Sequence, residues 1–222
     1  MFSIDLVILT KSAKKKGYCV AGIDLNTHDW VRLISSNDEC DGALSDSEMR
    51  SRGGYTFQPL DVVRVTISEH SPIGCQTENY IVAYGYPWQS LGRMNFQDVL
   101  RICSVVKSQY IFGNKYKYIT SETINAFNRS LLLTEVTDLH IFKNEMNKQK
   151  CNFRYNGNNY YELSVTDPDY YKYTDCEIKR AYIVVSLPHT DYEGKYYKFV
   201  AKIFPETQIV DKNPLSSLSS LF

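Results

Sequence analysis

The chain has 222 residues, of which 43% are hydrophobic and 23% are charged, so it can bury a core and a wholly disordered chain is excluded. Lys and Arg total 25 and Asp and Glu total 25, and this zero net charge excludes a protein that coats nucleic acid through a general basic excess. Any nucleic-acid binding must therefore use a local basic patch or stacking on aromatic rings. The length allows one large domain or two small ones.

Aromatic residues make up 14% of the chain, which favours strands and sandwich or barrel cores. The six cysteines include no Cys-x-x-Cys pair and have no histidine at zinc-finger spacing, so we expect free thiols, no metal and no other cofactor. We identify no signal peptide, and no apolar run approaches the roughly 20 residues that span a membrane. We expect a soluble, cytoplasmic protein.

In the N-terminal half, apolar runs bounded by turn residues predict strands at Phe2–Thr10, Tyr18–Asp24, Trp30–Ile34, Leu60–Ser68 and Tyr80–Tyr84. The lysine-rich stretch Lys11–Gly17 predicts a polar linker between the first two strands. Ser45 and Glu48 have the spacing of a capping box, which predicts a short helix there.

The middle of the chain changes to helical spacing. Apolar residues from Asn95 to Val106 recur at helical intervals, with Asn95 as the N-cap, and Thr120–Leu131 predicts a second short helix. The C-terminal half returns to predicted strands, at Leu132–Phe142, Asn152–Tyr155, Asn159–Val165, Tyr182–Leu187 and Tyr196–Phe204. Asn156-Gly157 predicts a tight turn.

Many short strands with turn signals between them are typical of barrels rather than of a parallel α/β sheet. The order of strands, helices and strands, in halves of similar size, predicts a mainly β (α+β) protein of two small barrels joined by a helical segment. We place the first barrel at residues 1–92, the helical connector at 93–131, the second barrel at 132–205 and a tail at 206–222. The tail is expected to be poorly ordered or to dock alone.

Motifs of the common enzyme classes are missing, among them the Walker-type phosphate loop, Gly-x-Gly-x-x-Gly, His-Glu-x-x-His and Gly-x-Ser-x-Gly. One loose pattern is that of a metal-dependent nuclease, in which Asp169 and Glu177 would hold Mg²⁺ and Lys179 would activate water. Its spacing is tight for two adjacent strands, and Glu193-Gly194-Lys195 repeats the Glu-x-Lys pattern elsewhere. A nuclease is therefore kept only as an alternative.

Three groups of short segments stand in a recognisable order: Cys19–Asp24 with Trp30–Leu33, Leu60–Val63 with Gln76–Asn79, and Tyr197–Ala201 with Ile203–Pro205. Together they resemble the dual OB-containing domain family, a group of bacterial and phage proteins often linked to defence loci. The resemblance implies two OB-like barrels and a role in recognising nucleic acid, and it implies no catalytic residues. In an OB barrel, bases stack on aromatic side chains in a groove across the strands, and phosphates meet Lys or Arg.

Trp30 and Arg32 lie two apart on one predicted strand and therefore share a face. An exposed Trp beside an Arg could stack a base and hold its phosphate. Alternatively, Trp30 is a core anchor and Arg32 pairs with a carboxylate. Gln76, Glu78 and Asn79 precede a strand, where their side chains could read base edges or a nucleotide, or could fix a turn by bonding to the backbone.

The basic candidates fall in two loops: Lys11, Lys14, Lys15 and Lys16 in the first, and Arg50 and Arg52 with Tyr55 in the second. The first could grip phosphates or be a solvated loop, and the second is a candidate nucleic-acid patch or a mobile loop. Tyr170, Tyr171 and Tyr173 would form a stacking platform if exposed, or would fill the second barrel if buried.

We therefore predict a non-catalytic protein that binds nucleic acid or a nucleotide-like ligand through OB-like barrels, in bacterial or phage defence. The alternative is an adaptor whose barrels bind a partner protein such as a nuclease or helicase. An exposed basic or aromatic groove favours the first hypothesis, and an exposed apolar patch favours the second.

Overall fold

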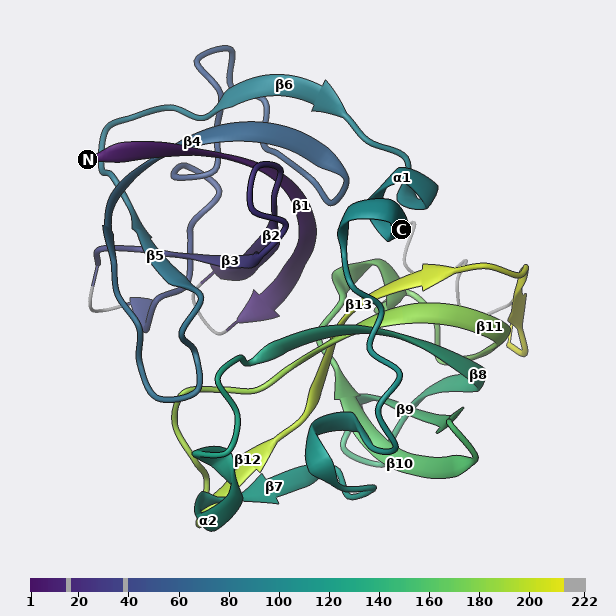
Figure 1. The fold of residues 1–222 in the computed structure, drawn as a ribbon. Coiled ribbons are helices and arrows are strands. Elements are labelled where there is room, and N and C mark those ends of the chain that lie inside the picture. Colours follow the sequence, from purple (N-terminus) through teal and green to yellow (C-terminus); the bar gives the residue numbers. More distant parts are fainter. Residues whose placement is uncertain (15–16, 38–39, 214–222) are drawn as a thin grey trace. The chain divides into compact units, whose positions relative to one another are not determined.

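The chain forms two compact units, Met1–Ser104 and Val105–Phe222, within a computed structural model that describes residues 1–14, 17–37 and 40–213 (Figure 1). Both units are built mainly of β-strands, which confirms the mainly β fold class. The predicted connector at 93–131 spans the division between the units, with one helix on each side of it.

The first unit is a closed five-stranded barrel with one added strand. Its strands are β1 (Phe2–Lys14), β2 (Gly17–Asp24), β3 (Trp30–Ile34), β4 (Asp61–His70), β5 (Asn79–Val82) and β6 (Gln89–Arg93). Neighbours follow the order β1-β2-β3-β5-β4, the β1–β4 pairing closes the ring, and β6 pairs with β4. β3 and β5 run parallel. A five-stranded barrel with this crossover is OB-like.

The first barrel closes because β1 is long and bulged. Phe2–Val7 pairs with β4, whereas Leu6–Lys14 pairs with β2, with a register shift between Ile8 and Thr10. A bulge bends a strand and increases its twist, so one strand can follow the curve between two partners. The linker predicted from Lys11 is therefore wrong, because β1 continues through Lys14, which pairs with Gly17.

Alternate residues of these strands build the core of the first unit. The fully enclosed side chains include Ile4, Leu6 and Ile8 of β1, Leu33 of β3, and Val63, Val65 and Ile67 of β4. Trp88 is buried beside them and stacks on Phe57 with ring centroids 5.9 Å apart. The apolar runs on which the strand predictions depended thus supply the buried residues, and Val7 and Leu9 of β1 are buried as well.

The helix predicted at Ser45 is wrong, although its capping box forms. The Ser45 N–H donates to Glu48 Oε2 at 2.8 Å, and the Glu48 N–H donates to Ser45 Oγ at 3.4 Å. The chain completes one turn and then enters a β-bridge between Arg50 and Thr56, so no helix can extend. A later helix, α1 (Phe96–Ile102), begins as predicted, with the side chain of Asn95 accepting from the Asp98 N–H.

The second unit repeats the strand arrangement of the first. Its barrel strands are β8 (Leu131–Lys143), β9 (Gln149–Tyr155), β10 (Asn158–Val165), β11 (Asp175–Ser186) and β13 (Phe199–Pro205), with β14 (Ile209–Asp211) added. Neighbours follow the order β8-β9-β10-β13-β11, β11 pairs back to β8, and β14 pairs with β11. β10 and β13 run parallel, as β3 and β5 do. The chain therefore contains two OB-like barrels, as predicted.

Shorter elements complete the second unit: η2 (Ile111–Gly113), β7 (Tyr118–Thr120), α2 (Ser121–Ile124), η3 (Pro168–Tyr170) and β12 (Lys195–Tyr197). The helix predicted at Thr120–Leu131 is wrong for most of its length, because Thr120 ends a strand and Leu131 begins another. The tight turn at Asn156-Gly157 is confirmed by positive φ angles of 46° and 79°. Among the described residues, none of the helices is both long and apolar enough to cross a membrane.

Candidate functional site

Three of the predicted binding residues meet in a buried network between β3 and β5. Arg32 lies opposite Asn79 in the parallel pairing, and its backbone N–H donates to Glu78 O at 2.7 Å. The Arg32 guanidinium lies 3.7 Å from Glu78 Oε1, and the amide of Asn79 donates to Gln76 Oε1 at 3.2 Å. Arg32 is only 5% exposed and Asn79 only 1%. The structure therefore places Arg32 against a carboxylate, while Trp30 at the start of β3 is half-buried.

A buried ion pair of this kind predicts a clear stability effect. We expect Arg32→Met to lower the free energy of unfolding by about 3 kcal/mol, because the Glu78 carboxylate stays buried without its cation. The double variant Arg32→Met/Glu78→Met should recover most of this loss, since it removes both charges together. Urea unfolding of the three proteins measures both effects. A double variant as unstable as the single one would contradict the pairing.

The lysine run at the end of β1 is largely neutralised where it can be described. Lys11 Nζ lies 3.3 Å from Asp46 Oδ1 and 4.5 Å above the ring of Tyr18. Lys14 Nζ lies 2.8 Å from Asp41 Oδ2. Lys15 and Lys16 fall outside the described residues. The two described lysines thus act as ion-pair partners for the loop that follows β3.

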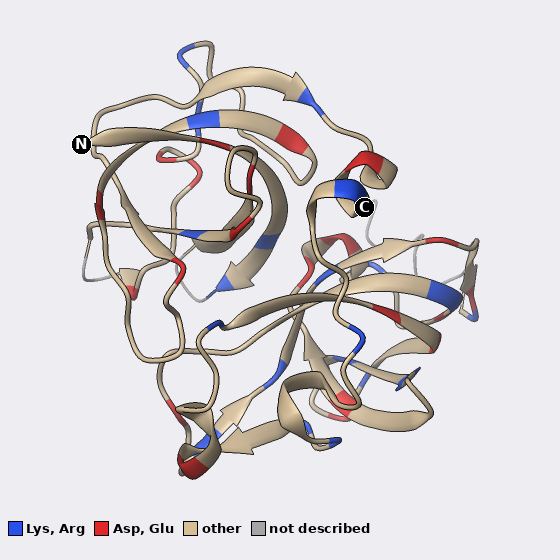
Figure 2. Cartoon of the chain, viewed as in Figure 1, with Lys and Arg blue, Asp and Glu red and all other residues tan. Residues whose placement is uncertain are grey.

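The second predicted patch forms an exposed hairpin over residues 50–56, which we call the arginine hairpin. The Ser51 N–H donates to Tyr55 O and the Gly54 N–H to Ser51 O, both at 3.0 Å, and Arg50 bridges to Thr56. Arg50 and Arg52 are exposed, and neither side chain has a carboxylate partner among residues 1–14, 17–37 and 40–213. Both signs of charge are spread over the strands and loops of each unit (Figure 2), which makes two uncompensated arginines on one hairpin a local excess.

A carboxylate beneath the hairpin fixes its aromatic side chain. Tyr55 Oη donates to Asp61 Oδ2 at 2.9 Å, and Arg93 of β6 donates to Asp61 Oδ1 at 2.7 Å. This hydrogen bond to Asp61 raises the pKa of the Tyr55 hydroxyl above its usual value. Tyr55 is 53% exposed, and Tyr86 is 50% exposed on a loop whose Trp88 N–H donates to Arg50 O at 3.1 Å. The hydrogen bond from Trp88 to Arg50 thus joins the loop of Tyr86 to the arginine hairpin.

Arg93 and Tyr86 were not among the predicted site residues. β6 has five exposed residues and no apolar alternation, so periodicity cannot reveal it as a strand. Tyr86 stands in the Tyr84-Gly85-Tyr86-Pro87 segment, whose Gly-Tyr-Pro run was the available signal for an exposed aromatic turn.

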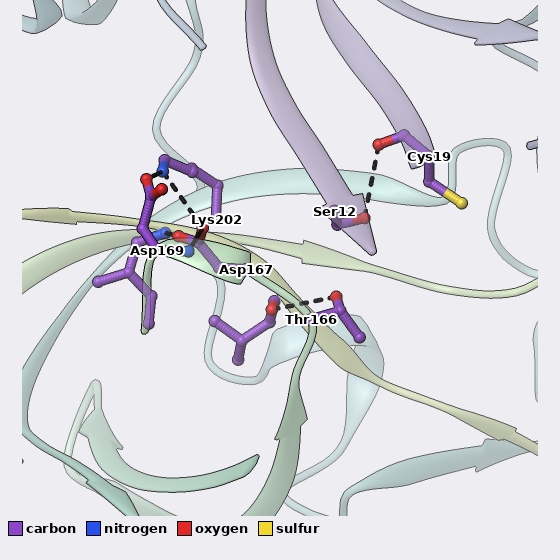
Figure 3. Close-up of polar contacts among 8 residues, drawn as sticks. Ser12, Cys19, Thr166, Asp167, Asp169 and Lys202 are labelled. Carbon is purple, nitrogen blue, oxygen red and sulfur yellow. Dashed lines mark hydrogen bonds and ion pairs between the residues drawn. The ribbon is translucent and has the colours of Figure 1, made fainter. Parts of the chain in front are cut away.

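The carboxylates of the nuclease alternative lie in separate ion pairs. Lys202 Nζ contacts Asp169 Oδ2 and, at 3.3 Å, Asp167 Oδ1 (Figure 3). Glu177 instead lies 3.0 Å from Lys212. Burial raises the pKa of Asp167 above its usual value, while Lys202 and the Ile203 N–H act in the opposite direction. In the part of the chain that the structure describes, no three His, Cys, Asp or Glu side chains gather as metal ligands.

The tyrosines near η3 divide between core and surface. Tyr170 is 3% exposed, with its ring 5.9 Å from that of Tyr173, whereas Tyr171 is 41% exposed. Burial raises the pKa of the Tyr170 hydroxyl. Tyr170 therefore fills the second barrel rather than forming a stacking platform.

Comparison with known proteins gives a family and weaker structural likenesses. The dual OB-containing domain matches residues 4–203. A murine DNA-binding protein bound to double-stranded DNA is similar with a TM-score of 0.36 and 9% identity, over 92% of this chain and 100% of that one. The Ifi202 HINa domain in complex with 20-bp double-stranded DNA gives a TM-score of 0.32 and 8% identity, over 94% of this chain and 95% of that one. No curated protein matches the sequence.

Proposed function

The chain belongs to the dual OB-containing domain family, and from this premise we propose that it binds nucleic acid through its OB-like barrels. The observation that carries the proposal is the arginine hairpin. Arg50 and Arg52 are exposed without carboxylate partners in the described structure, beside the half-exposed ring of Tyr55. Arginine matches phosphate geometry with a planar fork of donors, and an exposed aromatic ring can stack a base.

Local charge supports this surface despite the neutral chain. Arg93 is balanced by Asp61, which leaves Arg50 and Arg52 as an excess of positive charge at the hairpin. Phosphate contacts release counterions from nucleic acid, so affinity acquired in this way falls with salt. A neutral protein with such a patch binds nucleic acid through that patch and does not coat the duplex.

The test is fluorescence anisotropy with labelled single- and double-stranded DNA and RNA. We expect Arg50→Ser/Arg52→Ser to weaken binding to every probe that the wild type binds, and to reduce the slope of log affinity against log salt by about 2. The matched control is Arg101→Ser, because Arg101 is also exposed in the first unit but is paired with Asp98 at 2.7 Å. Equal affinity and slope in all three proteins would remove the hairpin from the site.

The wider setting of the proposal is the one that the family resemblance implies, defence in the cytoplasm of bacteria or in phages. Its test is infection of cells that express the wild type or the Arg50→Ser/Arg52→Ser variant, with the number of plaques as the measurement. Absence of binding to all four probes at low salt would instead favour an adaptor that binds a partner protein.

A further inference from the structure

A row of tyrosines covers one face of the two-stranded ladder of β7 and β12. Tyr118 pairs with Tyr197 across the ladder, and their ring centroids lie 5.8 Å apart. Tyr116 stacks on Tyr118 with centroids 6.3 Å apart and an interplanar angle of 21°. Lys195, on the same side as Tyr197, holds its Nζ 5.2 Å from the Tyr118 centroid. We call these four residues the tyrosine face.

The tyrosine face is held by the core but remains open to solvent. Ile119, whose side chain points to the opposite side of the ladder, is 1% exposed. Tyr116 is 59% exposed, and Tyr118 and Tyr197 are partly exposed. None of these three hydroxyls has a hydrogen-bond partner within the described segments. The three rings therefore keep part of their surface at the solvent, where a ligand can reach them.

Lys117, which follows Tyr116 in the sequence, belongs to a group of charged side chains around Glu162. Lys117, between Tyr116 and Tyr118, lies 2.9 Å from Glu162 Oε2, and Lys150 Nζ donates to Ser164 Oγ at 2.9 Å. Burial lowers the pKa of Lys150, and the positive charges of Lys117 and Lys148 lower it further, whereas Glu162 acts in the opposite direction. Asp191 and Glu193 lie in the loop before β12, where Asp191 accepts from the Gly194 N–H. Unlike these lysines, Lys195 holds its ammonium over a ring of the tyrosine face.

We propose that the tyrosine face binds single-stranded nucleic acid, with unpaired bases on Tyr116, Tyr118 and Tyr197 and a phosphate on Lys195. The inference rests on the proposed function and deepens it by naming the class of strand. Stacking requires the flat face of a base, which a duplex hides inside its helix, so this surface selects unpaired strands. Neighbouring rings about 6 Å apart suit successive bases of an extended strand.

The first arm of the test compares two substitutions at one position. We expect Tyr116→Ala to weaken binding of a labelled single strand about tenfold and Tyr116→Phe to leave it unchanged, because phenylalanine keeps the ring. Binding of the corresponding duplex should be the same in both variants. Tyr171→Ala is the matched control, a partly exposed tyrosine of the same unit that lies after η3. Equal single-strand affinity in the wild type and Tyr116→Ala would overturn the inference.

A second arm places the strand directly. Photocrosslinking of a single strand that carries 5-bromouracil, followed by peptide mass spectrometry, should modify the peptides containing Tyr116, Tyr118 or Tyr197. Crosslinks confined to other segments would overturn the inference, as would a lack of single-strand binding. Duplex binding that depends on Arg50 and Arg52, without single-strand binding, would leave the proposed function standing. Failure of both strand classes to bind would remove the proposed function as well.

Discussion

Gly22→Ala is expected to destabilise the first barrel by about 3 kcal/mol or more, because a side chain at this position has no space. Gly22 lies on β2 opposite Ile8, beside the bulge in β1. A Cβ atom there would lie 2.1 Å from the carbonyl oxygen of Val7 and 2.9 Å from Leu6 Cδ1. Relief of the first contact requires movement of the β1 backbone, which pairs with both β2 and β4. The substitution therefore acts on barrel closure.

Guanidinium unfolding followed by tryptophan fluorescence measures this effect. Trp30 and Trp88 are the two tryptophans of the chain, and both belong to the first unit, so the signal reports on that barrel. Gly53→Ala is the control, because the nearest atom to its added Cβ is Ser51 Oγ at 3.8 Å. We expect the control to stay within about 0.5 kcal/mol of the wild type. Equal unfolding midpoints for Gly22→Ala and Gly53→Ala would show that the β1 backbone can move at little cost in free energy.

Between about pH 7 and pH 9, the second unit is expected to gain stability through Lys198. This residue is 1% exposed, and its Nζ donates to Ile111 O at 2.6 Å and to the Asn114 backbone and side-chain oxygens at 2.8 and 2.9 Å. The ring of Tyr160 lies 5.7 Å from Nζ, and no carboxylate pairs with it among the described residues. Burial lowers the pKa of Lys198 to about 7.

The sign follows from proton counting. In this pH range an unfolded lysine keeps its proton while the buried one loses it, so the unfolded state binds more protons and stability rises with pH. The free energy of unfolding of the wild type, minus that of Lys198→Met, should rise by up to about 1.4 kcal/mol per pH unit. Far-ultraviolet circular dichroism during urea unfolding at several pH values measures it.

Lys179→Met, which removes an exposed lysine of β11, is the control and should show no such pH dependence. A constant difference between the wild type and Lys198→Met across this range would show that the three acceptor oxygens keep the ammonium protonated.

The result also bears on the tyrosine face. The Lys198 ammonium donates to the side chain of Asn114, and this side chain also accepts from the Tyr116 N–H at 2.9 Å. In addition, the backbone N–H of Lys198 donates to Lys117 O. Lys198→Met should therefore weaken single-strand binding as well.

Most of the barrel strands could be predicted because runs of apolar residues bounded by turn residues are local signals. β3 matches its predicted limits, and β10 differs by one residue. The Asn95 cap and the Asn156-Gly157 turn are also local, since each depends on backbone groups within a few residues. The capping box at Ser45 shows the limit of local signals. Its hydrogen bonds form, but the tertiary path of the next residues ends the turn.

In the candidate site, too, local sequence indicates some features and tertiary pairing determines others. Exposure of Arg50, Arg52 and Tyr55 follows from a glycine-bearing loop, which local sequence indicates. The burial of Arg32 depends on β5, whose parallel pairing brings Glu78 and Asn79 beside it from more than forty residues away. No pattern around Trp30 could show which partner occupies that position.

The tyrosine face shows what local sequence and tertiary pairing each contribute. Alternation of lysine and tyrosine in Lys115-Tyr116-Lys117-Tyr118 is visible in the sequence, although β7 begins only at Tyr118. Only the pairing of Tyr118 with Tyr197 joins the rings of the two segments into one row. Alternation is a property of neighbouring residues, whereas the pairing of β7 with β12, in a two-stranded sheet of their own, joins segments more than seventy residues apart. Strand identity was therefore readable from the chain, and the surfaces that two distant strands build together were decided by the fold.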